Sequence, residues 1–494
     1  MSRSKNYIYY ILLSLAVLLG IFLRTKMYIS GGVFEDDECR LACSMFSLNI
    51  WQMFGPIGPW SSSPVFMFIS KIVAHFSGYN EYALQFIPYL ASIISIFLFY
   101  KLSCEIFDKK YSVIIGMFLF GINTNLIYFS SVFKHYGIEL LIGILCLYYM
   151  PKIKFSELSK KQLIVLSSVV AALPLISLPS LFYTASFITV SLYENFKNKS
   201  KGLKKILKFL LPLGIVMLFY YTHNLAPTKI MQLSFYGPEW EDFYSTGFLN
   251  LILGNIFYFF RNSGYEVTLL LLICITIFGI CFNKSQRKPI NIYPVLVLGF
   301  VIFASITHIY PFMSRVATHL IPILIYLIIK PLEMFSDKKI PFYIIVILLF
   351  LGLGKYFSPD GIKGIYTCEG ALYYSPSSLM KTVSSNFQEN DNIIINEASA
   401  SSYYFYAKKY KIPNFEKICT IIQTPGEETE NIIKNTFNNL DTDKNYWIYI
   451  VKDFNRFPSN KYITKWANKQ NIKLYQQERS SYLYYIVPPY TRYE

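Results

Sequence analysis

Four consecutive carboxylate residues are the first candidates for chemistry. Glu35, Asp36, Asp37 and Glu38 follow shortly after the apolar run 7–23, which predicts a transmembrane helix, and Arg40 lies beside them. Carboxylates next to a bilayer are costly to hold unless they are solvated or take part in a reaction. The segment is therefore either a solvated loop or the edge of a catalytic site.

A second set of ionisable residues lies where other apolar segments begin or end. Lys134 occupies a turn in the run Phe133-Lys134-His135-Tyr136, Glu139 follows inside the next apolar segment, and Arg315 opens a later one. Such residues are functional candidates because their burial is expensive. Each also has a structural interpretation: Lys134 could reach the headgroups, Arg315 could anchor its helix, and Glu139 could pair with Lys134. Three histidines at similar positions are better interpreted as interfacial: His135, His223 and His308.

Composition places these charges in a polytopic membrane protein. Of 494 residues, 53% are hydrophobic and 15% charged, whereas a soluble domain carries about a quarter charged residues. The net charge is +16. In a membrane protein an excess of Lys and Arg usually belongs to cytoplasmic loops, so we expect no nucleic-acid partner. The eight cysteines form no C-x-x-C pair, which argues against a zinc site, although Cys368 and Cys419 could pair in an extracytoplasmic tail.

The apolar runs predict about eleven transmembrane helices. The first lacks a small-residue cleavage site after Leu23 and is kept as a span. An amphipathic segment at 64–76 and a short apolar piece at 248–260 are expected to be interfacial or re-entrant. The predicted spans are 7–23, 83–100, 112–128, 137–150, 163–176, 181–193, 206–221, 267–282, 292–306, 316–329 and 340–353.

Charge sets the orientation of these spans. With the N-terminus in the cytoplasm, the Lys- and Arg-rich loops 101–110, 152–161, 197–208, 284–288 and 330–339 all lie inside. The first outer loop, 24–82, with a helix expected at 37–53, and the second, 222–266, then face the exterior. We expect a multi-pass protein of the bacterial plasma membrane.

The tail changes character after residue 354. Residues 391–395, 446–451 and 481–487 have the pattern of buried strands, and 399–410 and 427–438 that of helices. We therefore expect a transmembrane domain at 1–354 and a small extracytoplasmic α/β domain at 355–494.

The two sets of charges suit one reaction. Transfer of a sugar from a lipid phosphate needs a carboxylate to take the proton of the incoming hydroxyl. It also needs cations to hold the departing phosphate as its charge grows. A lipid-linked donor would reach this site through the bilayer, which accounts for charges at the interface.

Short motifs in order along most of the chain resemble those of GT-C polyprenyl-phosphate-sugar transferases, a group that includes protein O-mannosyltransferases and lipid A aminoarabinose transferases. Asp37-Glu38-x-Arg40 resembles their first-loop motif, and Phe133 to Glu139 resembles a Lys-Pro-Tyr-Ser-x-Asp motif with Glu for Asp. Tyr310-Pro311 with Arg315 and Pro322 is similar to their late Tyr-Pro…Arg…Pro pattern. Two further matches contain departures: Ser63-Pro64-Val65-Phe66 for Pro-Pro-Leu-Tyr, and Asn390 for the glycine of a Gly-Asp-x-Ile-x-Val strand.

This resemblance implies an inverting transferase with a polyprenyl-phosphate-sugar donor and a glycan, lipid or protein acceptor. It implies Asp37 as general base and Glu38 as a structural residue or second acid. The phosphate or positioning contacts would be Arg40, Lys134 and Arg315, supported by Asp36, Tyr136 and Glu139. No cofactor is required, although Mg²⁺ or Mn²⁺ could bind outer oxygens of Asp36 and Glu38.

Three other functions fit parts of the pattern. An O-antigen polymerase or ligase would be expected to have an outer loop rich in Arg and His, whereas 222–266 has Lys229, Arg261 and His223 together with acids. A transporter or flippase would tend to have internal repeats and helices broken at midplane. A receptor or assembly protein with an outer α/β domain is the remaining alternative.

Overall fold

The computed structural model describes residues 3–57, 63–197, 202–236, 266–307, 309–310, 315–354, 358–360, 362–363, 376–422, 429–450, 462–463, 474–478 and 481–486. The chain forms two compact units. One comprises Met1–Gly31, Asn49–Ile72 and Gln85–Glu369, and the other comprises Gly32–Leu48, Val73–Leu84 and Gly370–Glu494. The second unit thus contains two segments from the N-terminal part of the chain. The predicted boundaries stay predictions. They are those of the two domains, 1–354 and 355–494, and of the two outer loops, 24–82 and 222–266.

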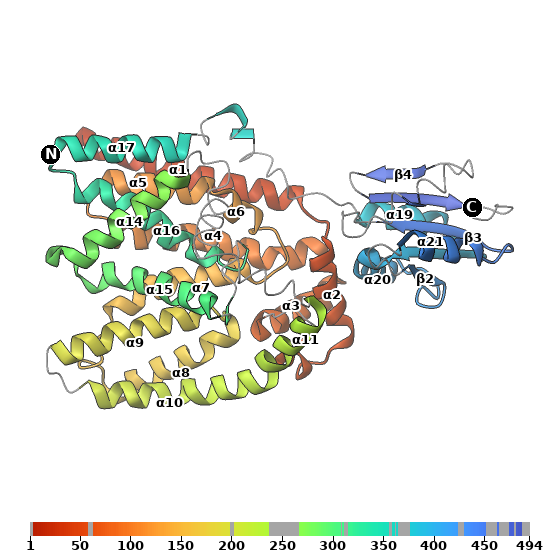
Figure 1. The fold of residues 1–494 in the computed structure, drawn as a ribbon, viewed down its shortest axis with the longest axis horizontal. Coiled ribbons are helices and arrows are strands. Elements are labelled where there is room, and N and C mark those ends of the chain that lie inside the picture. The colour runs from red at the N-terminus through yellow and green to blue at the C-terminus, as the bar shows by residue number, and fades with distance from the viewer. Residues whose placement is uncertain are drawn as a thin grey trace. The chain divides into compact units, whose positions relative to one another are not determined.

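The first unit consists of helices that pack side by side (Figure 1). Contacts join α1 to α5, α8 to α10, α9 to α15 and α14 to α16. α3 ends and α4 begins in segments of the second unit. The helices are α1 (Arg3–Ser30), α3 (Pro64–Ser77), α4 (Glu81–Ile106), α5 (Lys110–Ile122), α6 (Thr124–Tyr128), α7 (Tyr136–Tyr149), α8 (Lys160–Ile176), α9 (Ser180–Lys197), α10 (Leu203–Tyr220), α11 (Ala226–Tyr236), α14 (Glu266–Phe282), α15 (Pro289–Ile306), α16 (Ile321–Met334) and α17 (Lys339–Leu353).

Three helices in the described part of the chain are long and apolar enough to cross a membrane. They span Tyr7–Ser30, Glu81–Ile106 and Pro289–Ile306. Shorter apolar helices lie at Pro64–Ser77, Lys110–Ile122, Val267–Phe282 and Lys339–Leu353. The mostly helical class is thus observed, with three candidate spans among the described residues, and the number of eleven spans remains a prediction.

The predicted span 112–128 is wrong as a single helix, because it breaks at Asn123. The Asn123 side chain accepts a hydrogen bond from Leu126 N at 3.1 Å and caps α6. Ending α5 there frees backbone carbonyls, and the buried Arg24 guanidinium donates to two of them, Phe120 O and Gly121 O, both at 3.0 Å. Arg24 also donates to Ser92 Oγ at 2.9 Å. α1 therefore continues past the predicted end at Leu23, with Arg24 inside it.

Three other predicted boundaries shift. The helix expected at 37–53 ends at Ser47 as α2 (Asp36–Ser47), followed by the 3₁₀ turn η1 (Gln52–Phe54). α10 continues through a π-helical turn, η3 (Tyr221–Leu225), into α11, so the predicted second outer loop begins with helix. The span expected at 316–329 begins as the 3₁₀ turn η5 (Thr318–Leu320), and α16 continues to Met334.

The shift of α16 brings Lys330 into the protein, although we expected it in a cytoplasmic loop. Its ammonium lies 2.8 Å from Glu333 Oε2 and 3.3 Å from Asp108 Oδ2. Glu333 Oε1 in turn accepts a hydrogen bond from Lys109 N at 2.9 Å. A buried lysine is tolerated here because carboxylates surround it.

The second unit contains a five-stranded sheet with strand order β2-β1-β3-β5-β4. β1 (Asp391–Asn396) pairs in parallel with β2 (Cys419–Ile422) and β3 (Asn445–Ile450), with Ile393 opposite Cys419 and Trp447. β5 (Ser481–Ile486) pairs antiparallel with β3 and with β4 (Leu474–Glu478). The predicted strands at 391–395, 446–451 and 481–487 match β1, β3 and β5. The same unit contains α2 (Asp36–Ser47), α19 (Pro376–Asn386), α20 (Ala400–Lys409) and α21 (Thr429–Asn438).

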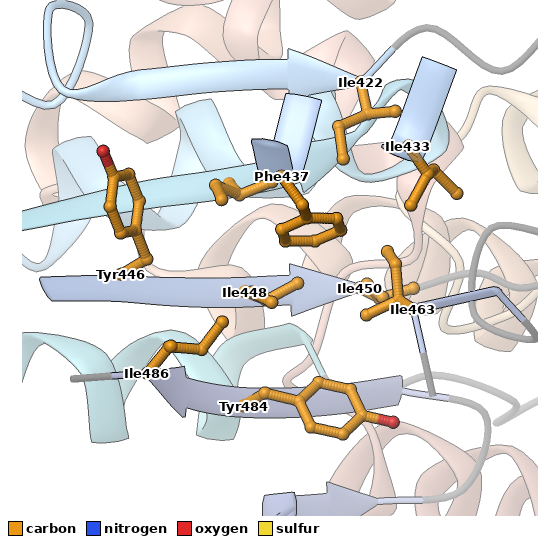
Figure 2. Packing of buried hydrophobic residues seen from close by; sticks show 10 residues of the cluster. Ile422, Ile433, Phe437, Tyr446, Ile448, Ile450, Ile463, Tyr484 and Ile486 are labelled. Carbon is orange, nitrogen blue, oxygen red and sulfur yellow. The ribbon is translucent and has the colours of Figure 1, made fainter. Parts of the chain in front are cut away.

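Alternating strand residues build two apolar layers on this sheet. On one face, Ile394, Ile448 and Ile450 pack with Ile433 and Phe437 of α21 (Figure 2). The other face packs on α19 and α20. There the Tyr449 hydroxyl donates to Pro376 O at 3.3 Å, and the Tyr449 and Tyr403 rings lie 6.4 Å apart.

A buried carboxylate fixes one end of the sheet. Asp391, the acid of the Asn390-Asp391 match, accepts hydrogen bonds from Gln388 N, Asn445 Nδ2, Trp447 Nε1 and Tyr485 Oη at 2.8–3.1 Å. Burial, together with this carboxylate, raises the pKa of the Tyr485 hydroxyl to about 12. The match in this domain therefore has a structural role.

Some expectations lie outside the described residues. These are the apolar piece 248–260, His308 and Cys368. Pairing of Cys368 with Cys419 therefore stays a prediction; Cys419 itself is a free thiol, and burial raises its pKa to about 12.

Candidate active site

The acidic residues form the first turn of α2. Gly32 has a φ of 85°, a left-handed conformation that favours glycine, and an added Cβ would lie 2.3 Å from the Tyr82 ring. Glu35 is the N-cap, and Glu38 Oε2 accepts a hydrogen bond from Glu35 N at 2.9 Å. Carboxylates are favoured in this turn because it has the positive end of the helix dipole. The Asp36 side chain lies outside the described part of the structure.

Position along α2 separates its charged residues into two groups. Glu38 is 2% exposed and lies with Cys39, Ala42 and Met45 in the buried stripe. Asp37 and Arg40 are half-buried and lie three residues apart, so they share the opposite stripe of the helix. The structure thus brings a carboxylate and a guanidinium to one face of α2, while it places Glu38 in the packing.

The second candidate group lies at the start of α7. Lys134 is 9% exposed, and its backbone N–H donates to Val132 O at 2.7 Å within the turn before the helix. His135 is the N-cap of α7, and the Tyr136 ring packs edge-on against Phe129, with centroids 5.1 Å apart. These residues form one loop–helix junction of the first unit, as their closeness in sequence predicted.

Glu139 points at His135 rather than at Lys134. Its Oε1 lies 3.6 Å from His135 Nε2, and it is 3% exposed. Burial, with a smaller contribution from Lys134, lowers the pKa of His135 to about 3, so the imidazole is neutral at pH 7. Glu139 Oε2 has no hydrogen-bond partner among the described residues. In the structure the Glu139 carboxylate therefore contacts His135, and not Lys134 as the ion-pair interpretation expected.

Arg315 lies in an exposed turn, six positions before α16 begins, and so does not open that helix as expected. Its carbonyl accepts a hydrogen bond from Thr318 Oγ1 at 3.1 Å. Residues 311–314 of the matched Tyr-Pro…Arg pattern lie outside the described ranges. His223 is exposed and stacks on Phe219, 4.2 Å between centroids, and its interfacial position stays a prediction.

A buried histidine was not anticipated from the sequence. His319 is fully buried in the first unit, and the Tyr183 hydroxyl lies 3.1 Å from its Nδ1 and 3.0 Å from its carbonyl oxygen. Its Nε2 has no hydrogen-bond partner in the described part of the chain. The only sequence signal was a lone histidine near the start of the predicted span 316–329, which is too common to single out.

These positions define what each group can do chemically. Asp37 and Arg40 offer a base and a cation on one helix face, and Lys134 adds a cation at the junction before α7. The two groups belong to different compact units. Among the described residues, no three His, Cys, Asp or Glu side chains gather in a way that could hold a metal ion. Because the Asp36 side chain lies outside the described residues, a cation at Asp36 and Glu38 stays a prediction.

The fold can be compared with known proteins. No family model matches the sequence, and no curated protein matches it by sequence. The crystal structure of apo ArnT from Cupriavidus metallidurans is similar over 98% of this chain and 98% of its own, with a TM-score of 0.53 and 9% identity. ArnT from the same organism bound to undecaprenyl phosphate is similar over 96% of this chain and 97% of that chain, with a TM-score of 0.50 and 11% identity.

At these identities the likeness concerns the fold. ArnT is a lipid A aminoarabinose transferase of the GT-C class. The resemblance inferred from the motifs around Asp37 and Lys134 is therefore confirmed at the level of architecture. The chain has the fold of these two ArnT structures.

Proposed function

We propose that this protein is an integral membrane glycosyltransferase that moves a sugar from a polyprenyl-phosphate donor to a glycan, lipid or protein acceptor. The observation that supports it most is the position of Asp37 and Arg40. They share one face of a helix that directly follows the first span, in a chain that has the ArnT fold over nearly its whole length. One of the two ArnT structures has undecaprenyl phosphate bound, which supports a lipid-phosphate donor here.

In the proposed reaction Asp37 takes the proton of the acceptor hydroxyl. The hydroxyl oxygen attacks the anomeric carbon from the side opposite the phosphate, so the configuration inverts. The bond between the anomeric carbon and the phosphate oxygen breaks, and polyprenyl phosphate leaves with the bonding electron pair. Arg40, Lys134 and Arg315 would stabilise the charge on that phosphate.

The same proposal includes the location of the protein. Its N-terminus would lie in the cytoplasm and its C-terminal domain outside the plasma membrane, because the Lys- and Arg-rich loops then all lie inside. Acceptor and donor would meet at the outer face.

A transfer assay tests the proposal directly. Purified full-length protein is incubated with polyprenyl phosphates that carry radiolabelled hexoses or pentoses and with extracted glycans, lipids and proteins, with and without Mg²⁺ or Mn²⁺. We expect label in one acceptor fraction and release of polyprenyl phosphate. We also expect undecaprenyl phosphate to raise the melting temperature, because a ligand of the native state stabilises it. Absence of transfer and of stabilisation would contradict the proposal.

A further inference from the structure

Helix α2 packs on α20 within the second unit. α20 lies more than 350 residues further along the chain: the hydrogen bond from Phe34 N to the Tyr406 hydroxyl joins residues 372 apart. Near the middle of α2, Cys43 Sγ donates to Ser401 O at 3.6 Å. The Phe405 ring contacts Phe34, with centroids 5.3 Å apart.

α20 contacts both ends of α2. At the N-terminal end, Tyr406 Oη accepts the Phe34 N–H at 2.9 Å, one residue before the Glu35 N-cap. At the C-terminal end, the Phe46 ring lies 5.9 Å from Phe405 and 4.1 Å below the Lys408 ammonium. A helix held at both ends cannot roll or slide freely.

The last turn of α20 makes a further contact in this unit. Lys409 forms an ion pair with Glu81, the first residue of α4. α20 thus contacts both N-terminal segments that belong to the unit, Gly32–Leu48 and Val73–Leu84.

We infer that α20 of the C-terminal domain sets the orientation of the catalytic helix, with Tyr406 as a positioning residue for Asp37. The inference rests on the proposed function. The contacts with α20 include Cys43 and Phe46 of α2. At about 100° per residue, Asp37 lies on the side of the helix opposite Phe46. Because a base must lie within hydrogen-bond reach of its proton, a small roll of α2 would move Asp37 out of range. The C-terminal domain is then part of the catalytic scaffold.

Two matched substitutions separate positioning from general stability. Tyr406→Phe removes the hydroxyl that accepts Phe34 N–H. The control, Tyr403→Phe, changes another fully buried tyrosine of the same helix, whose hydroxyl donates to Phe415 O at 2.7 Å and also interacts with the Cys419 thiol. Each variant loses a tyrosine–backbone hydrogen bond, and Tyr403→Phe also loses the Cys419 interaction, so the control should be destabilised at least as much as Tyr406→Phe.

Hydrogen exchange of the full-length protein gives a readout that does not depend on activity. We expect Tyr406→Phe to accelerate exchange of the peptide 34–47 by about fivefold to tenfold, the equivalent of one hydrogen bond. Tyr403→Phe should leave that peptide unchanged. Equal exchange of 34–47 in both variants would overturn the inference. If the wild type transfers no sugar, the proposed function fails, whereas this measurement still decides whether α20 fixes α2.

Kinetics test the catalytic part. We expect Tyr406→Phe to lower kcat by about 10-fold to 100-fold with an unchanged KM for the lipid donor, because the displaced group is a base and not a binding contact. An unchanged kcat, or a change confined to KM, would contradict the positioning role.

A cross-link keeps the inference testable if Tyr406→Phe does not fold. Ser401→Cys places a thiol beside Cys43, and dibromobimane becomes fluorescent when it joins two neighbouring thiols. We expect fluorescence above the wild-type background. A signal equal to that background would show that the two helices do not lie together.

Discussion

Adjacent carboxylates on α2 differ because their positions on the helix differ. Glu38 is buried and accepts the Glu35 N–H, so its charge stabilises the first turn of the helix. Asp37, one residue earlier, is half-buried on the face opposite the α20 contact. Of the two roles implied for Glu38, the geometry supports the structural one, and Asp37 remains our candidate base.

His135 is a second single residue with a predictable effect: it should make the free energy of unfolding depend on pH. Its pKa falls from 6.5 to about 3 on folding because the imidazole is buried beside Lys134. Between these pH values the unfolded chain binds a proton that the folded protein does not bind, so stability falls as pH falls. The contribution is about 1.4 kcal/mol per pH unit in this window and is absent above it.

His135→Gln removes this titration. We expect the melting temperature of the wild type in detergent to fall more steeply from pH 7 to pH 5 than that of His135→Gln. Parallel curves for the two proteins would show that His135 is not held neutral.

Among the elements, the break between α5 and α6 depends on a distant cation. The carbonyls of Phe120 and Gly121 have lost their helical partners and accept hydrogen bonds from Arg24 of α1. Arg24→Met would leave two buried carbonyls without these donors, at a cost of about 1–3 kcal/mol each. Thermal unfolding in detergent measures this loss, and Lys101→Met, at an exposed lysine, is the control. Equal melting temperatures for the two variants would contradict the structural role of Arg24.

Arg24 also illustrates what the sequence could not reveal. A prediction from hydropathy ends a transmembrane helix at the first charged residue. It contains no information on whether a guanidinium can donate hydrogen bonds to carbonyls of another helix. Strands β1 and β3 were predictable since both are short apolar runs, whereas β4, with the sequence Leu-Tyr-Gln-Gln-Glu, lacks that pattern. β2 is short and partly exposed.

The site was predictable to a similar extent. The acidic turn and the Lys134–Glu139 junction were found because their residues are contiguous in the sequence. The contact of Tyr406 with Phe34 was not, since it joins residues 372 positions apart and a tyrosine in a tyrosine-rich chain is no signal.

For the molecule as a whole, the ArnT fold persists at 9% identity, so it depends on patterns of polarity more than on particular residues. The same charge pattern predicts the orientation in the membrane. A cysteine at exposed Ser47 should react with a membrane-impermeant maleimide added to intact cells, whereas one at exposed Lys161 should react only after permeabilisation. The endogenous cysteines of the wild type set the background. The reverse pattern would place the acidic helix in the cytoplasm and contradict the proposed site.

The most direct test of the central claim is sugar transfer from a polyprenyl phosphate by Asp37→Asn. As a control, Asp360→Asn makes the same change at an exposed aspartate. Loss of a general base predicts that kcat of Asp37→Asn falls by about 100-fold or more, with the wild-type melting temperature, while Asp360→Asn retains full turnover. Wild-type turnover by Asp37→Asn would contradict the claim.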